Sequence, residues 1–501
     1  MNGLRCVLLP FLLMGAVLAG SHARGATLYV GAASCDITPD RPAFLYGQMA
    51  TRVSEGVQYP VTANILVLES REGDQSLESA IIISIDTCIV RECLLLPLRK
   101  GIQQQLPQFD LGKVIITATQ THAAPSAKDG YFKQQEGVLV PSDYVKSMVS
   151  IIGPATKQAW NARRKAKFSY GLGYAVVGRN RRAVYANSRA VMYGKTNAPE
   201  FRGFEGMEDH GVDCMFFWDM NDKLVAMIVT VACPPQEVEN SRLISSDFWG
   251  PTRDLLNKEY GQDVTILGLP GAGGEMSPHL LYRKAADDRM TRLRQLSRLQ
   301  ELARRIFRAV EEVYDVVRDD KQEDVVVKHQ YAVVDLPEYV VTEAEYKACK
   351  ASAERLHATS GDSYLRGNWH ARVIARYEKL RTDPRPMLPT DVNVLRIGDT
   401  VICTNQFELF IDYGVQIKAR SKAVQTFVVQ LANGSRNPEP PASASEFEKM
   451  AWHYASSNTY LPTERAMKGG GYSANAQSII VGPEGGQVLV EETVKMINAM
   501  F

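Results

Sequence analysis

The sequence predicts an α/β protein in which mixed sheets are flanked by helices. Short apolar runs of the kind found in buried strands recur along the chain, and helical patterns lie between several of them. Strands that alternate with helices favour an α/β architecture. The chain has 501 residues, enough to bury a large core. Its formal net charge of +1 gives no electrostatic footprint for nucleic acid.

The predicted strands are runs of mainly apolar residues. They are residues 80–86, 113–119, 224–233, 264–270, 391–405 and 426–434. Such runs are typical of strands covered on both faces. We therefore place these segments in the core.

The clearest predicted helix covers residues 291–320, and further helical patterns cover 247–260 and 408–422. Apolar residues of the long segment recur at every third or fourth position and form one stripe. They are Leu293, Leu296, Leu299, Leu302, Ile306, Val310, Val313 and Val316. We predict one continuous helix that packs on the core along this stripe.

A strand-like stretch at 321–339 and a charged, helical stretch at 341–385 predict an inserted subdomain near residues 318–390. The most loop-like part of the chain is 433–447, which is rich in Asn, Pro and Ser. No internal repeat divides the rest. We expect one large domain from residue 28 to 501 with this insertion.

Residues 1–23 have the pattern of an export signal. Arg5 supplies the positive charge, an apolar run follows, and Ser21 to Ala23 form a small-residue cleavage site. That run is too short for a membrane-spanning helix, and no other segment is apolar enough to span a bilayer. We predict a periplasmic or secreted protein that is cleaved near Ala23 and has no transmembrane segment.

Polar side chains gather where the predicted strands end. They are Gln120, His122, Gln236, Glu237, Ser277, His279, Glu408 and Tyr460. Ligands of α/β sheets bind beyond the carboxyl ends of the strands. We therefore expect an active site at these strand ends.

A series of short stretches occurs in the order found in the neutral, non-lysosomal ceramidase family. They are VGAASCDITPD, ATQTHAAP, GRNRRAV, GAGGEMSPH, FELF and TYLPTERAMKGGGY. From residue 28 onward the chain resembles the amino-terminal catalytic domain of that family. The resemblance implies a ceramidase-like α/β domain, with no counterpart of the family's carboxyl-terminal immunoglobulin-like domain.

The resemblance implies a zinc amidase, but two of the positions that bind the metal in the family differ here. Gln120 stands at the first histidine of the T-H-T-H motif, and Pro234 stands where a second zinc histidine belongs. Glu408 and Tyr460 match the other two ligands. Hydrolytic zinc usually needs about three protein ligands, so a zinc site would need replacements. The candidates are His210, Glu237 and His279.

The other residues of the family's site are better matched. Ser277 matches the serine of the G-D-x-S-P-N motif, Arg181 the arginine of N-R-S-P, and Tyr472 a substrate-facing tyrosine. His122 matches the second histidine of T-H-T-H, and we expect it to serve in acid–base chemistry or substrate hydrogen bonding. The site assignments are His122, Ser277, Arg181, Tyr460 and Tyr472 as catalytic, Gln120, Gln236 and His279 as substrate-binding, and Glu408 and His210 as metal ligands if zinc binds.

Three functions remain open from the sequence. The first is a ceramidase-like hydrolase that cuts an amide or ester bond of a lipid or glycan. The second is a metal-independent carbon–oxygen lyase or dehydratase that acts on uronic-acid-containing oligosaccharides through His and Tyr. The third is a binding protein that kept the fold without the chemistry. Each takes a small-molecule, lipid or oligosaccharide ligand.

Overall fold

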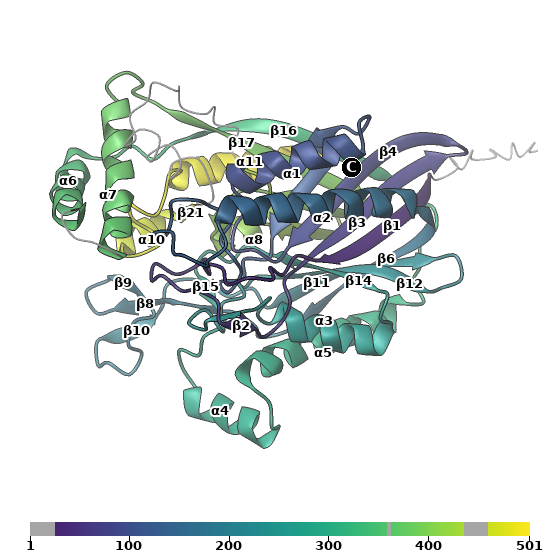
Figure 1. Ribbon diagram of the computed structural model, residues 1–501, viewed down its shortest axis with the longest axis horizontal. Coiled ribbons are helices and arrows are strands. Elements are labelled where there is room, and N and C mark those ends of the chain that lie inside the picture. The colour runs from purple at the N-terminus through teal and green to yellow at the C-terminus, as the bar shows by residue number, and fades with distance from the viewer. Residues whose placement is uncertain (1–25, 358–361, 435–458) are drawn as a thin grey trace, which may run out of the picture.

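Two β-sheets lie face to face at the centre of the molecule, and helices cover their outer faces (Figure 1). The structure is a computed structural model that describes residues 26–357, 362–434 and 459–501. The predicted signal at 1–23 and most of the loop at 433–447 lie outside these residues. No helix among the described residues is long and apolar enough to cross a membrane.

The larger sheet has eight strands, in the order β14 (Thr265–Pro270), β12 (Leu224–Val231), β11 (Gly211–Asp219), β6 (Arg164–Tyr174), β1 (Thr27–Asp36), β3 (Thr62–Glu72), β4 (Gln75–Ile85) and β5 (Val114–Ala118). The smaller sheet has four, in the order β16 (Val327–Pro337), β17 (Met387–Ile397), β18 (Thr400–Thr404) and β20 (Gln425–Val429). Most neighbours are antiparallel, whereas the pairs β4–β5, β12–β14 and β18–β20 are parallel.

Apolar side chains of both sheets meet between them. Phe168 and Phe217 of the larger sheet, with ring centroids 5.4 Å apart, share this core with Phe427 of the smaller sheet. Successive strand residues face opposite sides, so Leu66 points into this core and Ile65 into the helices outside. Burial on both faces explains the uninterrupted apolar runs of the sequence.

Helices form the outer layers on both sides, as predicted. One half of the larger sheet is covered by α1 (Glu92–Gln105) and α2 (Pro141–Asn161), and the other half by α3 (Trp249–Tyr260) and α5 (Arg298–Val317). The smaller sheet packs on α8 (Ile411–Arg420) and α11 (Pro483–Asn498). The predicted fold class, mixed sheets with flanking helices, is confirmed.

The prediction of one continuous helix over 291–320 is wrong. The chain instead forms α4 (Lys284–Leu293) and α5, and Gln295 between them has φ +54°. A new helix starts because Ser297 and Gln300 form a reciprocal capping box. As a result Leu293 and Val316, assigned to the buried stripe, are 61% and 73% exposed.

The predicted insertion near 318–390 is partly built into the smaller sheet. β16 and β17 are antiparallel neighbours there, and the chain between them forms the helices α6 (Glu343–His357) and α7 (Asp362–Lys379). These two helices project from one end of the molecule (Figure 1).

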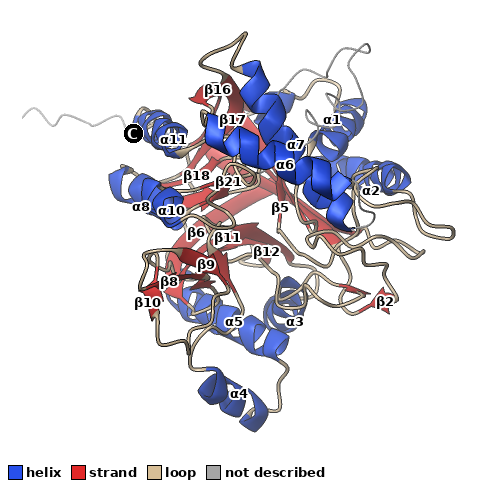
Figure 2. Cartoon of the chain, turned by 90° about the vertical axis from the view of Figure 1, so that its left-hand side faces the viewer, coloured by secondary structure: helices blue, strands red, loops and turns tan. Residues whose placement is uncertain are grey.

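A three-stranded sheet lies at the same end of the molecule, which faces the viewer in Figure 2. Its order is β10 (Phe201–Phe204), β8 (Arg182–Tyr185) and β9 (Ala190–Met192). Two-stranded pairs join β7 (Arg179–Asn180) to β15 (Met276–Ser277), β19 (Glu408–Leu409) to β21 (Tyr460–Leu461), and β2 (Gly56–Val57) to β13 (Leu243–Ile244). The helix α10 (Glu464–Gly469) follows β21.

The segment that follows β20 holds both edge strands of the larger sheet. The backbone N–H of Gln430 donates to the Pro270 carbonyl at 3.0 Å, at the end of β14. On the other side, the Ala118 N–H of β5 donates to the Leu431 carbonyl at 3.3 Å, and the Asn433 N–H donates to the Ile116 carbonyl at 2.7 Å. The carboxyl ends of β5, β14 and β20 therefore meet, although β5 and β14 are at opposite edges of the sheet.

Candidate active site

Gln120 lies just beyond β5, with a backbone φ of +75° in the left-handed region. Its N–H donates to the Thr87 carbonyl at 3.0 Å, which holds this unfavourable conformation. The side-chain Nε2 donates to Glu408 Oε2 at 2.9 Å, and Oε1 accepts from Gln430 Nε2 at 2.9 Å. The amide thus links the ends of β5, β18 and β20.

The carboxylate of Glu239 lies between two imidazoles. Its Oε2 is 3.3 Å from His122 Nδ1, and its Oε1 is 3.6 Å from His279 Nδ1. Gln236 Nε2 donates to the same carboxylate at 3.1 Å. All four side chains come from segments that follow β5, β12 and β14.

The His122–Glu239 pair favours the ionised form of both groups. Burial lowers the pKa of His122, but interactions with Cys88 and with the Glu239 carboxylate outweigh it and leave that pKa well above its ordinary value. Burial raises the pKa of Glu239, yet hydrogen bonding and attraction to His122 leave it below the ordinary value. At neutral pH we therefore treat His122 as a cation and Glu239 as an anion.

Gly47 fixes the position of the His122 ring. It has φ +105°, and a Cβ built there would lie 2.6 Å from His122 Cγ. Only glycine allows this close approach. The loop that carries Gly47 thus packs closely against His122 and limits the positions of its ring.

We expect Gly47→Ala to lower catalytic rate on the order of 10²-fold, because it displaces the imidazole from its working position. Gly130→Ala is the matched control, since Gly130 also has a left-handed φ of +71° but open space around its Cβ position. Rate and unfolding midpoint would be measured for both. Equal rate losses in the two variants would contradict a specific role of the Gly47–His122 contact.

Arg181 is the buried cation of the site and is 3% exposed. Its Nη2 donates to the Tyr460 hydroxyl at 3.1 Å and to the Gly274 carbonyl at 2.8 Å. Its Nη1 donates to Gln236 Oε1 at 3.2 Å and to the Tyr193 hydroxyl at 3.4 Å. The guanidinium therefore joins the Glu239 cluster to the tyrosines.

The hydroxyl of Ser277 is fully buried beside Tyr193. The Tyr193 hydroxyl lies 3.1 Å from Ser277 Oγ, and the His279 backbone N–H donates to the same oxygen at 3.2 Å. β15 places Ser277 here through its pairing with β7, the strand that precedes Arg181. Ser277 is thus held on the Arg181 side of the cluster.

Tyr460 and Tyr472 meet beyond Arg181. Their hydroxyl oxygens are 3.4 Å apart, and their rings pack edge to face with centroids 5.4 Å apart. Trp369 of α7 stacks on the Tyr472 ring at 5.7 Å. Burial raises the pKa of Tyr460 well above its ordinary value and that of Tyr472 to about 12, so both phenols carry their protons at neutral pH.

Two of the candidate metal ligands are paired with side chains other than Glu408. His210 Nε2 pairs with Glu208 Oε2 at 3.1 Å. Glu237 lies 3.8 Å from Arg298, and burial raises its pKa to about 8. No hydrogen bond or ion pair among the described residues joins either of them to Glu408.

The donor set at the positions implied by the resemblance does not fit zinc. The amide oxygen of Gln120 already accepts from Gln430, and Glu408 accepts from Gln120. Tyr460 accepts from the positively charged Arg181 at 3.1 Å. A second cation at this position would be repelled by that guanidinium. No group of three or more His, Cys, Asp or Glu side chains in the described ranges is arranged to hold a metal.

Several residues of the cluster were not assigned from the sequence. They are Cys88, Tyr193, Glu239, Trp369 and Gln430. Glu239 follows the same strand as Gln236 and Glu237, so strand-end position was the available signal for it. Tyr193 and Trp369 lie in segments with no motif, and only the tertiary structure brings them to the site.

Comparison with solved structures supports the ceramidase fold. The chain is similar to a neutral ceramidase from Pseudomonas aeruginosa, with a TM-score of 0.66 and 15% identity over 95% of this chain and 74% of that one. A second structure, a ceramidase complexed with C2, gives a TM-score of 0.62 and 14% identity over 95% of this chain and 75% of that one. No family model and no curated protein matches the sequence.

At this level of identity the similarity defines the fold alone. The chain is therefore a ceramidase-fold protein whose central cluster contains an arginine, paired histidines and tyrosines. The fold expected from the sequence motifs is confirmed.

Proposed function

We propose that this protein is an exported hydrolase that cuts an amide or ester bond and works without zinc. The observation that carries the proposal is the Glu239 carboxylate between His122 and His279, which two hydrogen bonds through Gln236 connect to the buried Arg181. This arrangement supplies a base, an acid and a fixed positive charge in one cluster. The signal-like residues 1–23 support export.

Hydrolysis in this cluster uses Glu239 as the base and His122 as the acid. A water oxygen bonds to the substrate carbonyl carbon while its proton passes to the Glu239 carboxylate. The carbonyl oxygen becomes negatively charged, and the Tyr460 and Tyr472 hydroxyls donate hydrogen bonds to it. Arg181, 3.1 Å behind the Tyr460 oxygen, supplies the compensating positive charge.

The bond to the leaving atom then breaks as the His122 imidazolium donates its proton to that nitrogen or oxygen. The products are a carboxylic acid and an amine or alcohol. Glu239 now holds the proton of the water, and His122 has lost its own. Exchange with solvent then takes the proton from Glu239 and returns one to His122, which restores the ion pair at 3.3 Å.

The second candidate is elimination from a uronic acid, which Arg181 and its tyrosines favour because a guanidinium and phenols would bind and neutralise a substrate carboxylate. Elimination also needs a base that removes the α-proton. The raised pKa values of Tyr460 and Tyr472 make these phenols donors rather than bases, so the α-proton would have to pass to Glu239. We place hydrolysis first because the two similar solved structures are ceramidases.

The products distinguish the two reactions. The purified protein is offered an N-acylated lipid in micelles and a hexasaccharide of alternating N-acetylhexosamine and hexuronic acid, each with and without EDTA. We expect free amine, no new ultraviolet absorbance, and the same rate after chelation. Zinc content is measured on the same protein.

Other outcomes would overturn the proposal in distinct ways. Absorbance from a conjugated unsaturated sugar, without amine, would establish the lyase. Loss of rate with EDTA, restored by zinc, would show that the protein depends on the metal. Binding of either compound without turnover would leave the protein as a binding protein.

A further inference from the structure

A pocket of about 700 Å³ opens beside the catalytic cluster. Its walls come from the β8–β9 hairpin and from Gly471 and Tyr472. Tyr472 is shared, because it lines the pocket while its hydroxyl lies 3.4 Å from that of Tyr460. The volume is within the roughly 300–1,000 Å³ of small-ligand sites.

The lining of this pocket combines aromatic rings with planar polar groups. Tyr185 and Tyr472 supply rings, Asn187 an amide, and Arg189 and Glu200 charges. Among the described residues, neither Arg189 nor Glu200 forms an ion pair with another side chain. Both charges are exposed, and an acyl chain placed here would offer them no hydrogen bond. A sugar ring offers both hydroxyls for the charges and an apolar face for the rings.

Neighbouring side chains hold Tyr472 in place. Trp369 stacks on the Tyr472 ring with an interplanar angle of 21°, and Arg182 Nη1 donates to the Tyr472 carbonyl at 2.7 Å. A fixed aromatic wall binds a ring with less loss of conformational entropy than a mobile one.

We infer that this pocket is a subsite for a sugar ring of an oligosaccharide substrate, bound so that the scissile group reaches Tyr460. The inference rests on the proposed function for its catalytic end and names the substrate class as glycan rather than lipid. Arg189 hydrogen-bonds the hydroxyls or acidic group of that ring, and Tyr472 packs against its face.

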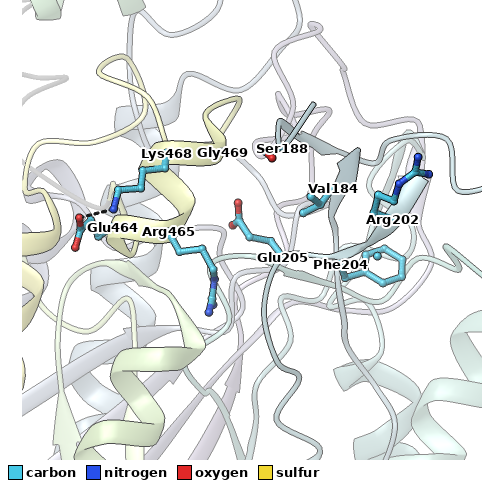
Figure 3. A pocket seen from close by; sticks show the side chains of 10 residues that line it. Val184, Ser188, Arg202, Phe204, Glu205, Glu464, Arg465, Lys468 and Gly469 are labelled. Atoms are coloured by element: carbon cyan, nitrogen blue, oxygen red, sulfur yellow. Dashed lines mark ion pairs between the residues drawn. The ribbon is translucent and has the colours of Figure 1, made fainter. Parts of the chain in front are cut away.

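A second pocket of about 700 Å³, on the opposite face of the three-stranded sheet, supplies the control (Figure 3). Successive strand residues alternate in direction, so Val184 lines this pocket while Tyr185 lines the first. Its charges are largely engaged, since Lys468 pairs with Glu464 at 2.7 Å and Arg465 with Asp412 at 3.0 Å. Arg202 lines it, as Arg189 lines the first pocket.

Binding is measured on a His122→Ala background, so that turnover does not enter the result. The probes are the hexasaccharide of N-acetylhexosamine and hexuronic acid and an N-acylated lipid in micelles. The signal is the fluorescence of Trp369, isolated by subtracting a Trp369→Phe protein, because the chain has five tryptophans. We expect the hexasaccharide alone to change it.

Arg189→Gln should weaken hexasaccharide binding about tenfold, because hydrogen bonds to a charged group are lost, whereas Arg202→Gln should leave it unchanged. Equal affinity of Arg189→Gln and the parent protein, or a Trp369 response to the lipid alone, would overturn the subsite. Sugar binding that depends on Arg189 but no turnover by the wild-type protein would retain the subsite and reject the proposed hydrolysis.

Discussion

Replacing His122 by alanine should lower kcat about 10²–10⁴-fold, the usual contribution of a general acid–base group. The fold should survive, because His122 is a partly exposed side chain at the end of a strand rather than part of the core. Steady-state rates and denaturant midpoints of wild type and variant would be compared. His279→Ala is the control, since it contacts the same Glu239 carboxylate from 3.6 Å but has no proton-transfer role in the proposed steps.

The pH dependence of the rate should follow the direction in which the pKa of His122 is shifted. A raised pKa means that the imidazolium persists to higher pH than usual, so the rate should fall only as pH rises through that raised value. The lowered pKa of Glu239 places the acid limb below the ordinary range of a glutamate. A rate that instead rises through the alkaline range would show that neutral His122 is the active form and would reverse the assigned roles.

Replacing Arg182 by methionine should destabilise the protein by about 3–5 kcal/mol, as expected when one partner of a buried ion pair is removed. Arg182 has no exposed side-chain surface, and it pairs with Glu205 while donating to the carbonyls of Gly470 and Tyr472. It therefore fastens α10 and the Tyr472 loop to β8. The change would be measured as a shift of the denaturant midpoint.

Arg420→Met tests the same substitution at a surface ion pair. Arg420 and its partner Glu491 are 41% and 49% exposed, and exposed pairs contribute about 0.2–1 kcal/mol. A loss of stability in Arg182→Met no larger than that in Arg420→Met would show that burial does not determine how much the Arg182 ion pair contributes to stability.

Several strands that are buried on both faces could be predicted from the sequence. The apolar runs at 113–119 and 264–270 correspond to β5 and β14. The predicted runs omit β1 and β6, where exposed positions such as Lys165 interrupt the apolar pattern, and they also omit the buried strands β3 and β11. The helix break at Gln295 was hidden because the stripe of apolar residues continues through it, although the Ser297–Gln300 capping box marks the new start.

The site could be predicted to the extent that strand-end position and family motifs define it. His122, Arg181, Ser277 and Tyr460 all lie in the connected cluster. The partners that set their chemistry could not be found in this way. Tyr193 lies more than 80 residues before Ser277 in the chain. It reaches Ser277 through tertiary structure, because its N–H donates to the Arg181 carbonyl and the neighbouring strand β7 pairs with β15.

The segment that follows β20, residues 430–433, also affects solubility. Open strand edges pair with other chains and promote aggregation. Here the β5 edge bonds to Leu431 and Asn433, while the β14 carbonyls of Gly268 and Pro270 accept from the Ser84 hydroxyl and the Gln430 N–H. The same few bonds that assemble the catalytic cluster thus occupy the edges of the larger sheet. Breaking these bonds would expose those edges. A motion that opened the site by separating residues 430–433 from β5 and β14 would therefore favour self-association.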